Sequence, residues 1–356
     1  MYLDPDFPMD DIRLIASDLE SANNLIPGFV PPDAGLLSVA AMYYAAEVDK
    51  QELFLLPDRN VVTRIAGIAR DGMPKSVDLP TALSAKVMAY AQCLSLQFEP
   101  SIAYHELAHS KGNAVAIDEL RWFRKGDVSQ PQAWVDLALG RRKVIDQIDV
   151  EVEVERDLAF PLHRWRRNYL VSLKIAELEL KDTQPISRVL DLFNWMQEDF
   201  LIAGPALIFA TMYFAPKSPK RNMLKQLKSR DRSRAISGIR NAAWDITHLS
   251  DFVKRVLEGN EQNRRYILVT ADKAMGTLAP LLLWNFDDEE DLIEPLVFRL
   301  QEWWPQKEAV SIAENMVAPL KIASGKSERK RPNFDNGTLD EWTVRAEEKI
   351  LNWRPS

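Results

Sequence analysis

The feature that most constrains the fold is a pair of short apolar runs, each of which ends in an aspartate. ELFLLPD covers residues 52–58 and is stopped by Pro57 before Asp58, and RRYILVTADKAM carries a second run at 266–270 that leads to Asp272. Short apolar runs bounded by such residues predict buried strands. Because ligands gather outside the carboxyl ends of strands in open α/β sheets, we expect the two aspartates to meet there.

Most of the remaining sequence indicates helices. Glycine is scarce, at 13 of 356 residues, and apolar residues often recur every three or four positions. We predict an α/β fold with a small parallel sheet flanked by helices, predominantly helical overall. Residues 146–160, DQIDVEVEVERDLAF, fit either a strand or an acidic helix. The predicted helices lie in residues 11–26, 35–51, 77–96, 99–113, 169–181, 186–203 and 241–257.

The composition restricts the class of protein and its compartment. Cys93 is the one cysteine in the sequence, which excludes a disulfide framework within one chain and favours a reducing, cytoplasmic setting. The net charge of -7 disfavours a globally basic nucleic-acid binder. We expect no signal peptide, because the N-terminus is acidic. The longest apolar stretch, 200–215, contains Gly204 and Pro205 and is too short to span a membrane, so we expect a buried element.

One helix carries the spacing of a zinc hydrolase. His105, Glu106 and His109 form H-E-x-x-H in IAYHELAHSKGN, a pattern that places two histidines on one helical face. A catalytic zinc also needs a third protein ligand, and the extended form of the motif would have a histidine where Val115 stands. A zinc metallohydrolase is therefore an alternative that lacks a third ligand in the sequence.

A different set of residues also includes Glu106. Four acids stand in apolar surroundings, where a carboxylate is unfavourable unless it is paired or bound to a metal. Clustered carboxylates would raise one another's pKa values, and a hard divalent cation removes that penalty. The four are Asp58, Glu106, Asp245 and Asp272.

In these positions the sequence resembles the PIN-domain nucleases, a family that includes toxin ribonucleases of bacterial toxin–antitoxin systems. That family has a strand leading into an aspartate, a helical glutamate, a third acid in a later helix, and a last acid in T-x-D after a strand. The resemblance covers about residues 50–112 and 236–290. The matching residues are Asp58 and Asn60 in PDRNVV, Glu106, Asp245, and Thr270 with Asp272 in LVTADKAM.

The resemblance implies a domain organisation. A PIN-like catalytic core would comprise residues 51–112 and 236–290, preceded by an N-terminal helical segment at 1–50. The long interval between Glu106 and Asp245 would then be a helical insertion at 113–235, and 291–356 a C-terminal helical segment. Within that interval Glu119 or Asp118 could replace Glu106, and Asp251 could replace Asp245.

The resemblance also implies metal-dependent hydrolysis of phosphodiester bonds. The four carboxylates would hold Mg²⁺ or Mn²⁺, which lowers the pKa of a bound water and stabilises the leaving oxygen. Asn60 and Thr270 would orient ligands or water, and His248 would support Asp245. Lys273 could face a phosphate, although a solvent-facing lysine is the more common case.

Basic residues gather in two places that suit a nucleic-acid backbone. HRWRRN combines three arginines with a tryptophan, a combination suited to single strands, and residues 216–240 carry nine basic residues against one acid. Both also fit solvated surfaces. The family resemblance favours RNA as the substrate, with an antitoxin, another partner protein or a homo-oligomer as further partners. The predicted contacts are Arg164, Arg166, Arg167, Lys225, Lys228, Arg232 and Arg234.

A noncatalytic reading stays open beside the enzyme. Aspartates at strand ends are also good N-caps for the helices that follow. On that reading the chain is a helical interaction protein, and Asp58 and Asp272 tolerate replacement by asparagine.

Overall fold

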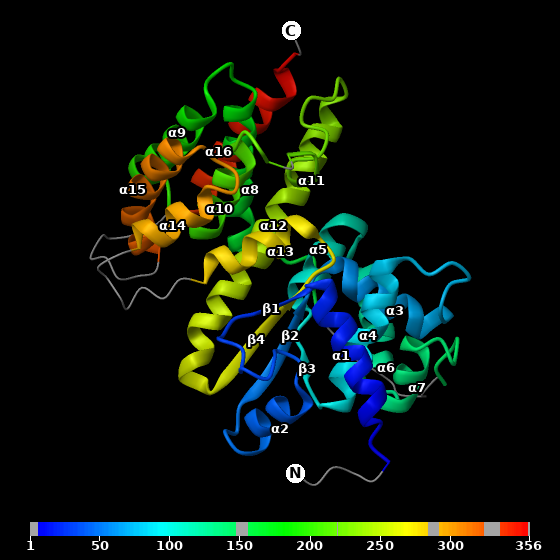
Figure 1. Ribbon diagram of the computed structural model, residues 1–356. Coiled ribbons are helices and arrows are strands. Elements are labelled where there is room, and N and C mark those ends of the chain that lie inside the picture. Colours follow the sequence, from blue (N-terminus) through cyan, green and yellow to red (C-terminus); the bar gives the residue numbers. More distant parts are fainter. Residues whose placement is uncertain (1–5, 147–155, 219, 284–291, 324–334, 355–356) are drawn as a thin grey trace. The chain divides into compact units, whose positions relative to one another are not determined.

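A computed structural model describes residues 6–146, 156–218, 220–283, 292–323 and 335–354 (Figure 1). The chain divides into two compact units. Unit 1 comprises Met1–Phe160 and Asp251–Gly276, and unit 2 comprises Pro161–Ser250 and Thr277–Ser356.

Unit 1 contains a four-stranded mixed sheet with the order β1-β4-β2-β3. β2 (Glu52–Pro57) is the first predicted strand, and β4 (Arg264–Val269) is the second. They pair in parallel along their whole length, as predicted. β3 (Gln97–Phe98) also pairs in parallel with β2. β1 (Leu25–Pro27) pairs antiparallel with β4, so the small sheet is mixed and the predicted parallel pairing applies only to β2, β3 and β4.

The two unpredicted strands are short and depend on their partners. Residues 24–26 end a helical pattern in the sequence, but α1 ends at Ala22 and Asn23 adopts a left-handed conformation. The three residues of β1 then complete hydrogen bonds on the free edge of β4. β3 similarly follows the end of α4. A strand of two or three residues carries no periodicity of its own, which is why the pattern missed both.

The helices of unit 1 match the predicted ranges in part: α4 and α5 lie within 77–96 and 99–113, whereas α1 and α2 end before the predicted 26 and 51. Asp58 caps α3 and Asp78 caps α4, each by accepting from the backbone N–H three residues on, and Pro80 stands in the first turn of α4. Figure 1 shows α1, α3 and α4 beside the strands. The helices are α1 (Met9–Ala22), α2 (Val39–Glu47), α3 (Arg59–Asp71), α4 (Leu79–Cys93), α5 (Ser101–Lys111), α6 (Asn113–Asp127) and α7 (Pro131–Ala138).

Unit 2 is helical in its described residues. α10 covers most of the longest apolar stretch, 200–215, and nearly all its side chains are buried, as expected. No helix among the described residues is long and apolar enough to cross a membrane. The helices that begin in this unit are α8 (His163–Glu179), α9 (Pro185–Glu198), α10 (Gly204–Phe214), α11 (Lys220–Met223), α12 (Arg232–Gly259), α14 (Ile293–Leu300), α15 (Gln306–Ala323) and α16 (Asn336–Asn352).

The units divide the chain differently from the predicted segments. α6 and α7, placed in the predicted insertion at 113–235, pack on α3 and α4 in unit 1. Residues 236–250, placed in the predicted core, belong to unit 2. α13 (Lys273–Leu278) begins in unit 1, at the end of β4. Of the ambiguous residues 146–160, 147–155 lie outside the described ranges.

The basic segment 216–240 is largely ordered by helices. α12 begins at Arg232, within the segment, and continues to Gly259 as one helix of 28 residues. Gly238 permits a close approach to the preceding loop, because a Cβ there would lie 1.9 Å from the Lys225 carbonyl oxygen. Only part of the segment is therefore a connection.

Candidate functional site

Asp58 is held in place by hydrogen bonds from three donors at the carboxyl end of β2. Its side chain is buried with 3% exposure. Oδ1 accepts from the Val61 N–H at 2.9 Å, and Oδ2 accepts from the Thr270 hydroxyl at 2.5 Å and the Ala271 N–H at 3.3 Å. The Asp58 carboxylate thus caps α3 and ties β2 to the residues that follow β4.

Thr270 joins the two strand-end aspartates. Its hydroxyl donates to Asp58 and accepts from the Asp272 N–H at 3.0 Å. Asn24 fixes the Thr270 backbone. Its Nδ2 donates to the Thr270 carbonyl at 2.9 Å, and its own backbone carbonyl accepts from the Thr270 N–H at 3.0 Å. The Asp272 Oδ1 accepts from the Ala274 N–H at 2.7 Å, which caps α13. Asp272 is thus linked to Asp58 through its backbone N–H and Thr270, while its carboxylate caps α13.

Glu106 reaches the same edge of the sheet through an arginine. The Arg59 Nη1 lies 3.2 Å from the Glu106 Oε1, and both side chains are largely buried. Arg59 is the first residue of α3 and follows Asp58 directly. The predicted glutamate therefore stands beside a cation that belongs to the protein itself.

The other predicted residues of the core lie in different places. Asn60 is exposed in the first turn of α3, and its carbonyl accepts from Arg64 at 3.0 Å. Asp245 and His248 lie in α12 within unit 2, whereas Asp58, Glu106 and Asp272 lie in unit 1. Asp245 is half-buried and His248 is buried.

Glu119 or Asp118 could replace Glu106 and Asp251 could replace Asp245 in the predicted site, but Glu119 and Asp251 have partners in unit 1. Glu119 accepts from the Thr63 hydroxyl at 2.7 Å, and Asp118 is exposed. Asp251 belongs to unit 1 and pairs with Arg255 at 2.6 Å. These contacts join neighbouring helices or successive turns of one helix, which is the usual structural role of such pairs.

The two histidines of H-E-x-x-H face backbone carbonyls. The His105 Nδ1 lies 2.8 Å from the Leu158 oxygen, and the His109 Nε2 lies 3.3 Å from the Phe160 oxygen. Partial burial lowers the pKa of His105 below its ordinary value. Both contacts tie the segment before unit 2 to α5, and neither supplies the third ligand that a catalytic zinc requires.

No group of three or more histidine, cysteine, aspartate or glutamate side chains that could hold a metal ion occurs among the described residues. Within unit 1, Asp58, Glu106 and Asp272 therefore do not form a three-carboxylate group, and Asp245 lies in unit 2. The arrangement instead presents two aspartates joined by Thr270, with an Arg59–Glu106 ion pair next to one of them.

Two of the predicted nucleic-acid contacts, Arg232 and Arg166, bind other groups within unit 2. Arg232 is 7% exposed, and its guanidinium donates to the carbonyls of Leu227, Ser229 and Ile350 at 2.7–3.0 Å. Burial lowers its pKa. The prediction that Arg232 contacts a phosphate is therefore corrected: its side chain links the start of α12 to the end of α16. Arg166 pairs with Asp340.

The remaining predicted contacts differ in exposure. Lys225, Lys228 and Arg234 are exposed, in or just before α12. Arg164 and Arg167 are partly buried in the first turns of α8. The exposed residues of the 216–240 segment thus remain the better candidates for contact with an anionic backbone.

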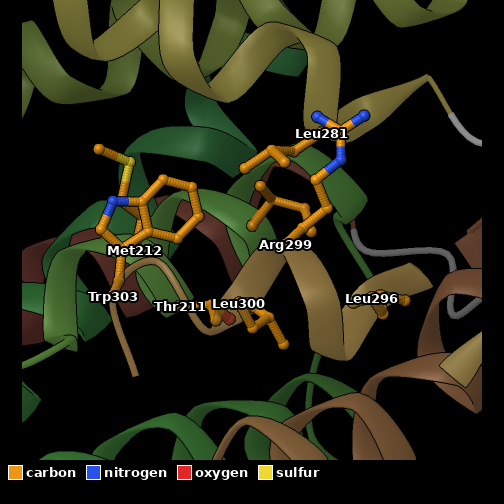
Figure 2. Close-up of a pocket in the computed structure, with 8 residues that line it drawn as sticks. Thr211, Met212, Leu281, Leu296, Arg299, Leu300 and Trp303 are labelled. Atoms are coloured by element: carbon orange, nitrogen blue, oxygen red, sulfur yellow. The ribbon is translucent and has the colours of Figure 1, made fainter. Parts of the chain in front are cut away.

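Unit 2 also contains a small apolar pocket, whose free space is about that of one water molecule. Figure 2 shows it between the ends of several helices, with the Arg299 side chain extending toward Leu281 and Trp303 beside Met212. The lining has one charged group, Arg299, and carries none of the predicted site residues. Its size and composition give no room for a substrate.

No family model, no curated protein and no solved structure matches this chain. The candidate site consists of the side chains at the ends of β2 and β4. Arg59 is the residue there that the sequence patterns did not single out, although it follows Asp58 directly in PDRNVV.

Proposed function

We propose that this protein is a PIN-like endoribonuclease, which hydrolyses phosphodiester bonds in RNA with Mg²⁺ or Mn²⁺ at the edge where β2 and β4 end. The observation that carries the proposal is the connection from Asp58 through Thr270 to Asp272. It links the ends of two adjacent parallel strands, each followed by an aspartate, at the position where open α/β sheets bind ligands.

The donor atoms suit a hard divalent cation held by two carboxylates. Mg²⁺ commonly binds one or two carboxylates and keeps several waters, so a protein cage of four acids is not required. A cation bound there would supply a water of lowered pKa and neutralise charge on the scissile phosphate.

The chain's own residues supply orientation. Thr270 and the N-terminus of α3 fix the plane of the Asp58 carboxylate. Asp272 is fixed by the first N–H groups of α13. Such prior orientation reduces the rearrangement required when a charged substrate binds. Exposed Asn60 would orient a water or a phosphate oxygen.

The wider biological role follows from the family resemblance alone. It favours RNA over DNA and a role as a toxin or defence effector, with an antitoxin or a second copy of the chain as partner. The single cysteine favours a cytoplasmic setting.

A noncatalytic interaction protein is the second candidate, and one observation favours it. Asp58 and Asp272 both accept hydrogen bonds from the first turn of the following helix. N-capping of this kind contributes about 1 kcal/mol to stability and is sufficient reason for an aspartate at each position.

Replacement by asparagine separates the two candidates. Asparagine caps helices about as well as aspartate, but it is a poorer ligand for a divalent cation because it lacks the charge. The experiment compares Asp58→Asn and Asp272→Asn with Asp78→Asn, which alters an N-cap of the same unit at the start of α4. Cleavage of single-stranded RNA is measured in Mn²⁺ and in EDTA, with thermal unfolding of each variant.

We expect Asp58→Asn and Asp272→Asn to reduce Mn²⁺-dependent cleavage on the order of a hundredfold, which corresponds to about 2.7 kcal/mol of transition-state stabilisation. Asp78→Asn should cleave as the parent does. Asp272→Asn is the decisive variant if burial of Asp58 makes its replacement destabilising. Equal cleavage by all three variants, or cleavage in EDTA, would overturn the nuclease proposal in favour of the second candidate.

A further inference from the structure

Arg59 occupies a position that is unfavourable for the helix it begins. It is the first residue of α3, directly after the N-cap Asp58. A positive charge near a helix N-terminus opposes the helix dipole, by about 0.3–1 kcal/mol at exposed sites. The stability of α3 therefore does not explain why a cation stands at this position.

The Arg59 guanidinium is held in one orientation and still has donors to offer. Nη1 contacts the Glu106 Oε1 at 3.2 Å, and 26% of the Arg59 side chain is exposed. A guanidinium has five N–H groups in a planar fork. The described ion pair with Glu106 uses one nitrogen, which leaves the other N–H groups for the exposed side of the guanidinium.

The planar guanidinium is the side-chain group whose geometry best matches that of a phosphate. Arginine binds phosphate oxygens through two parallel N–H···O bonds, whereas lysine acts as a point charge. The neighbouring carboxylates of Asp58 and Asp272 would repel a phosphodiester unless cations stood beside them. Arg59 is one such cation, placed next to Asp58 by the chain itself.

We propose that Arg59 binds a backbone phosphate of single-stranded RNA, and that Glu106 is the positioning residue which orients Arg59. This inference rests on the proposed nuclease function and deepens it. It changes the role predicted for Glu106, which acts through Arg59 and is not a cation ligand. The absence of a group of three metal-binding side chains among the described residues agrees with that role.

The chain offers a matched control on the same helix. Arg64 lies in α3, 27% of its side chain is exposed, and it pairs with a carboxylate, Asp78, at 3.4 Å. It therefore resembles Arg59 in residue type, exposure and pairing, but its partner caps α4 and it does not adjoin Asp58. A general effect of removing a charge from α3 should appear equally at both positions.

The test measures binding of a fluorescein-labelled, single-stranded RNA of mixed sequence by fluorescence anisotropy. It is done in EDTA and again in Ca²⁺, with a gel to establish that the RNA remains intact. We expect Arg59→Gln to weaken binding about tenfold and to reduce the slope of log K against log salt by about 0.7, the value for one phosphate contact to a single strand. The RNA affinity of Arg59→Lys should fall between those of Arg59→Gln and the parent. The affinity of Arg64→Gln should stay within about twofold of that of the parent.

Glu106→Gln distinguishes positioning from cation binding. The glutamine oxygen can still accept from Arg59, so RNA affinity should be retained or increased, and the Mn²⁺ concentration for half-maximal cleavage should be unchanged. An increase of about tenfold or more in that concentration, within the range seen when metal sites lose supporting groups, would make Glu106 a cation ligand and overturn this role.

The remaining outcomes separate this inference from the proposed function. If Arg59→Gln binds RNA as Arg64→Gln does, while Asp272→Asn still abolishes cleavage, the phosphate contact is wrong and the nuclease stands. If binding depends on Arg59 but the parent does not cleave RNA, the phosphate contact stands and the nuclease fails. If the parent binds no RNA in either buffer, both fail.

Discussion

Buried carboxylates in the two units are satisfied in different ways. In unit 1 the donors described for Asp58 are two backbone N–H groups and a hydroxyl. In unit 2 Glu179, at 7% exposure, lies 2.6 Å from Arg188 and 3.0 Å from Lys220. Neutral donors fix the orientation of a carboxylate without cancelling its charge, whereas cations cancel it. The second arrangement is a structural ion pair.

The basic residues show the converse difference. Arg232 in unit 2 is buried against three carbonyls and lies over the Trp353 ring, 4.8 Å from its centroid. Arg59 in unit 1 is partly exposed beside a carboxylate. Both are arginines in the first turn of a helix, so the local sequence does not distinguish them. Their tertiary neighbours differ: Arg232 is buried against carbonyls, whereas Arg59 keeps part of its side chain exposed.

The largest effect is expected at Glu179. Glu179→Ala would leave Arg188 and Lys220 without their carboxylate in a buried site, which should lower the free energy of unfolding by about 3–5 kcal/mol. Urea denaturation measures it. Glu341→Ala, which removes the exposed partner of Arg345 on α16, should change stability by less than about 1 kcal/mol. Similar losses at both positions would remove the distinction between buried and exposed pairs.

Arg232 should come next, with an effect on stability alone. Arg232→Met keeps much of the apolar contact with Trp353 but removes the donors to three carbonyls, and we expect a loss of about 2–3 kcal/mol. RNA affinity of the folded variant, measured by anisotropy, should not change. Arg234→Met, two residues along the same helix and exposed, should leave stability within about 0.5 kcal/mol. A selective loss of RNA affinity in Arg232→Met would contradict the structural role.

Thr270 tests the connection between the strand-end aspartates. Thr270→Val keeps the shape of a buried side chain but removes the hydroxyl, which leaves the Asp58 Oδ2 and the Asp272 N–H without this partner. We expect a loss of about 1–3 kcal/mol, measured by urea denaturation. Thr270→Ser should recover most of it. Thr63→Val, which removes the bond to Glu119 at an exposed site, is the control, and an equal loss there would argue against a special role for Thr270.

The parts of the site that could be predicted from sequence are those fixed by local rules. Apolar runs in the sequence predict β2 and β4. Parallel pairing of these strands brings Asp58 and Asp272 to one edge of the sheet. Helix starts at Asp58 and Asp78 follow from capping. These features depend on residues within a few positions of one another, or on the one rule that carboxyl ends of parallel strands share an edge.

The parts that could not be predicted depend on contacts between distant residues. Arg232 owes its burial to Ile350 and Trp353, more than a hundred positions away. The division between the units falls inside α12, where helical periodicity continues without a break, so the sequence does not separate Asp245 from the strand-end acids. Charge and spacing in the sequence identify a candidate residue, but the residues that contact it in the folded chain determine its role.

The smallest predicted effect concerns His105 and pH. Burial holds the pKa of His105 below its ordinary value of about 6.5, so the unfolded chain binds a proton more readily than the folded one. The contribution of His105 to stability is therefore complete above about pH 6.5 and is lost as the pH falls toward its folded pKa. His105→Asn keeps a donor for the Leu158 carbonyl but does not titrate, so its urea midpoint should fall less than that of the parent between pH 8 and 5. The exposed His163→Asn leaves this contribution in place, and if His105→Asn showed the same pH dependence as His163→Asn, the contact with Leu158 would not link protonation to folding.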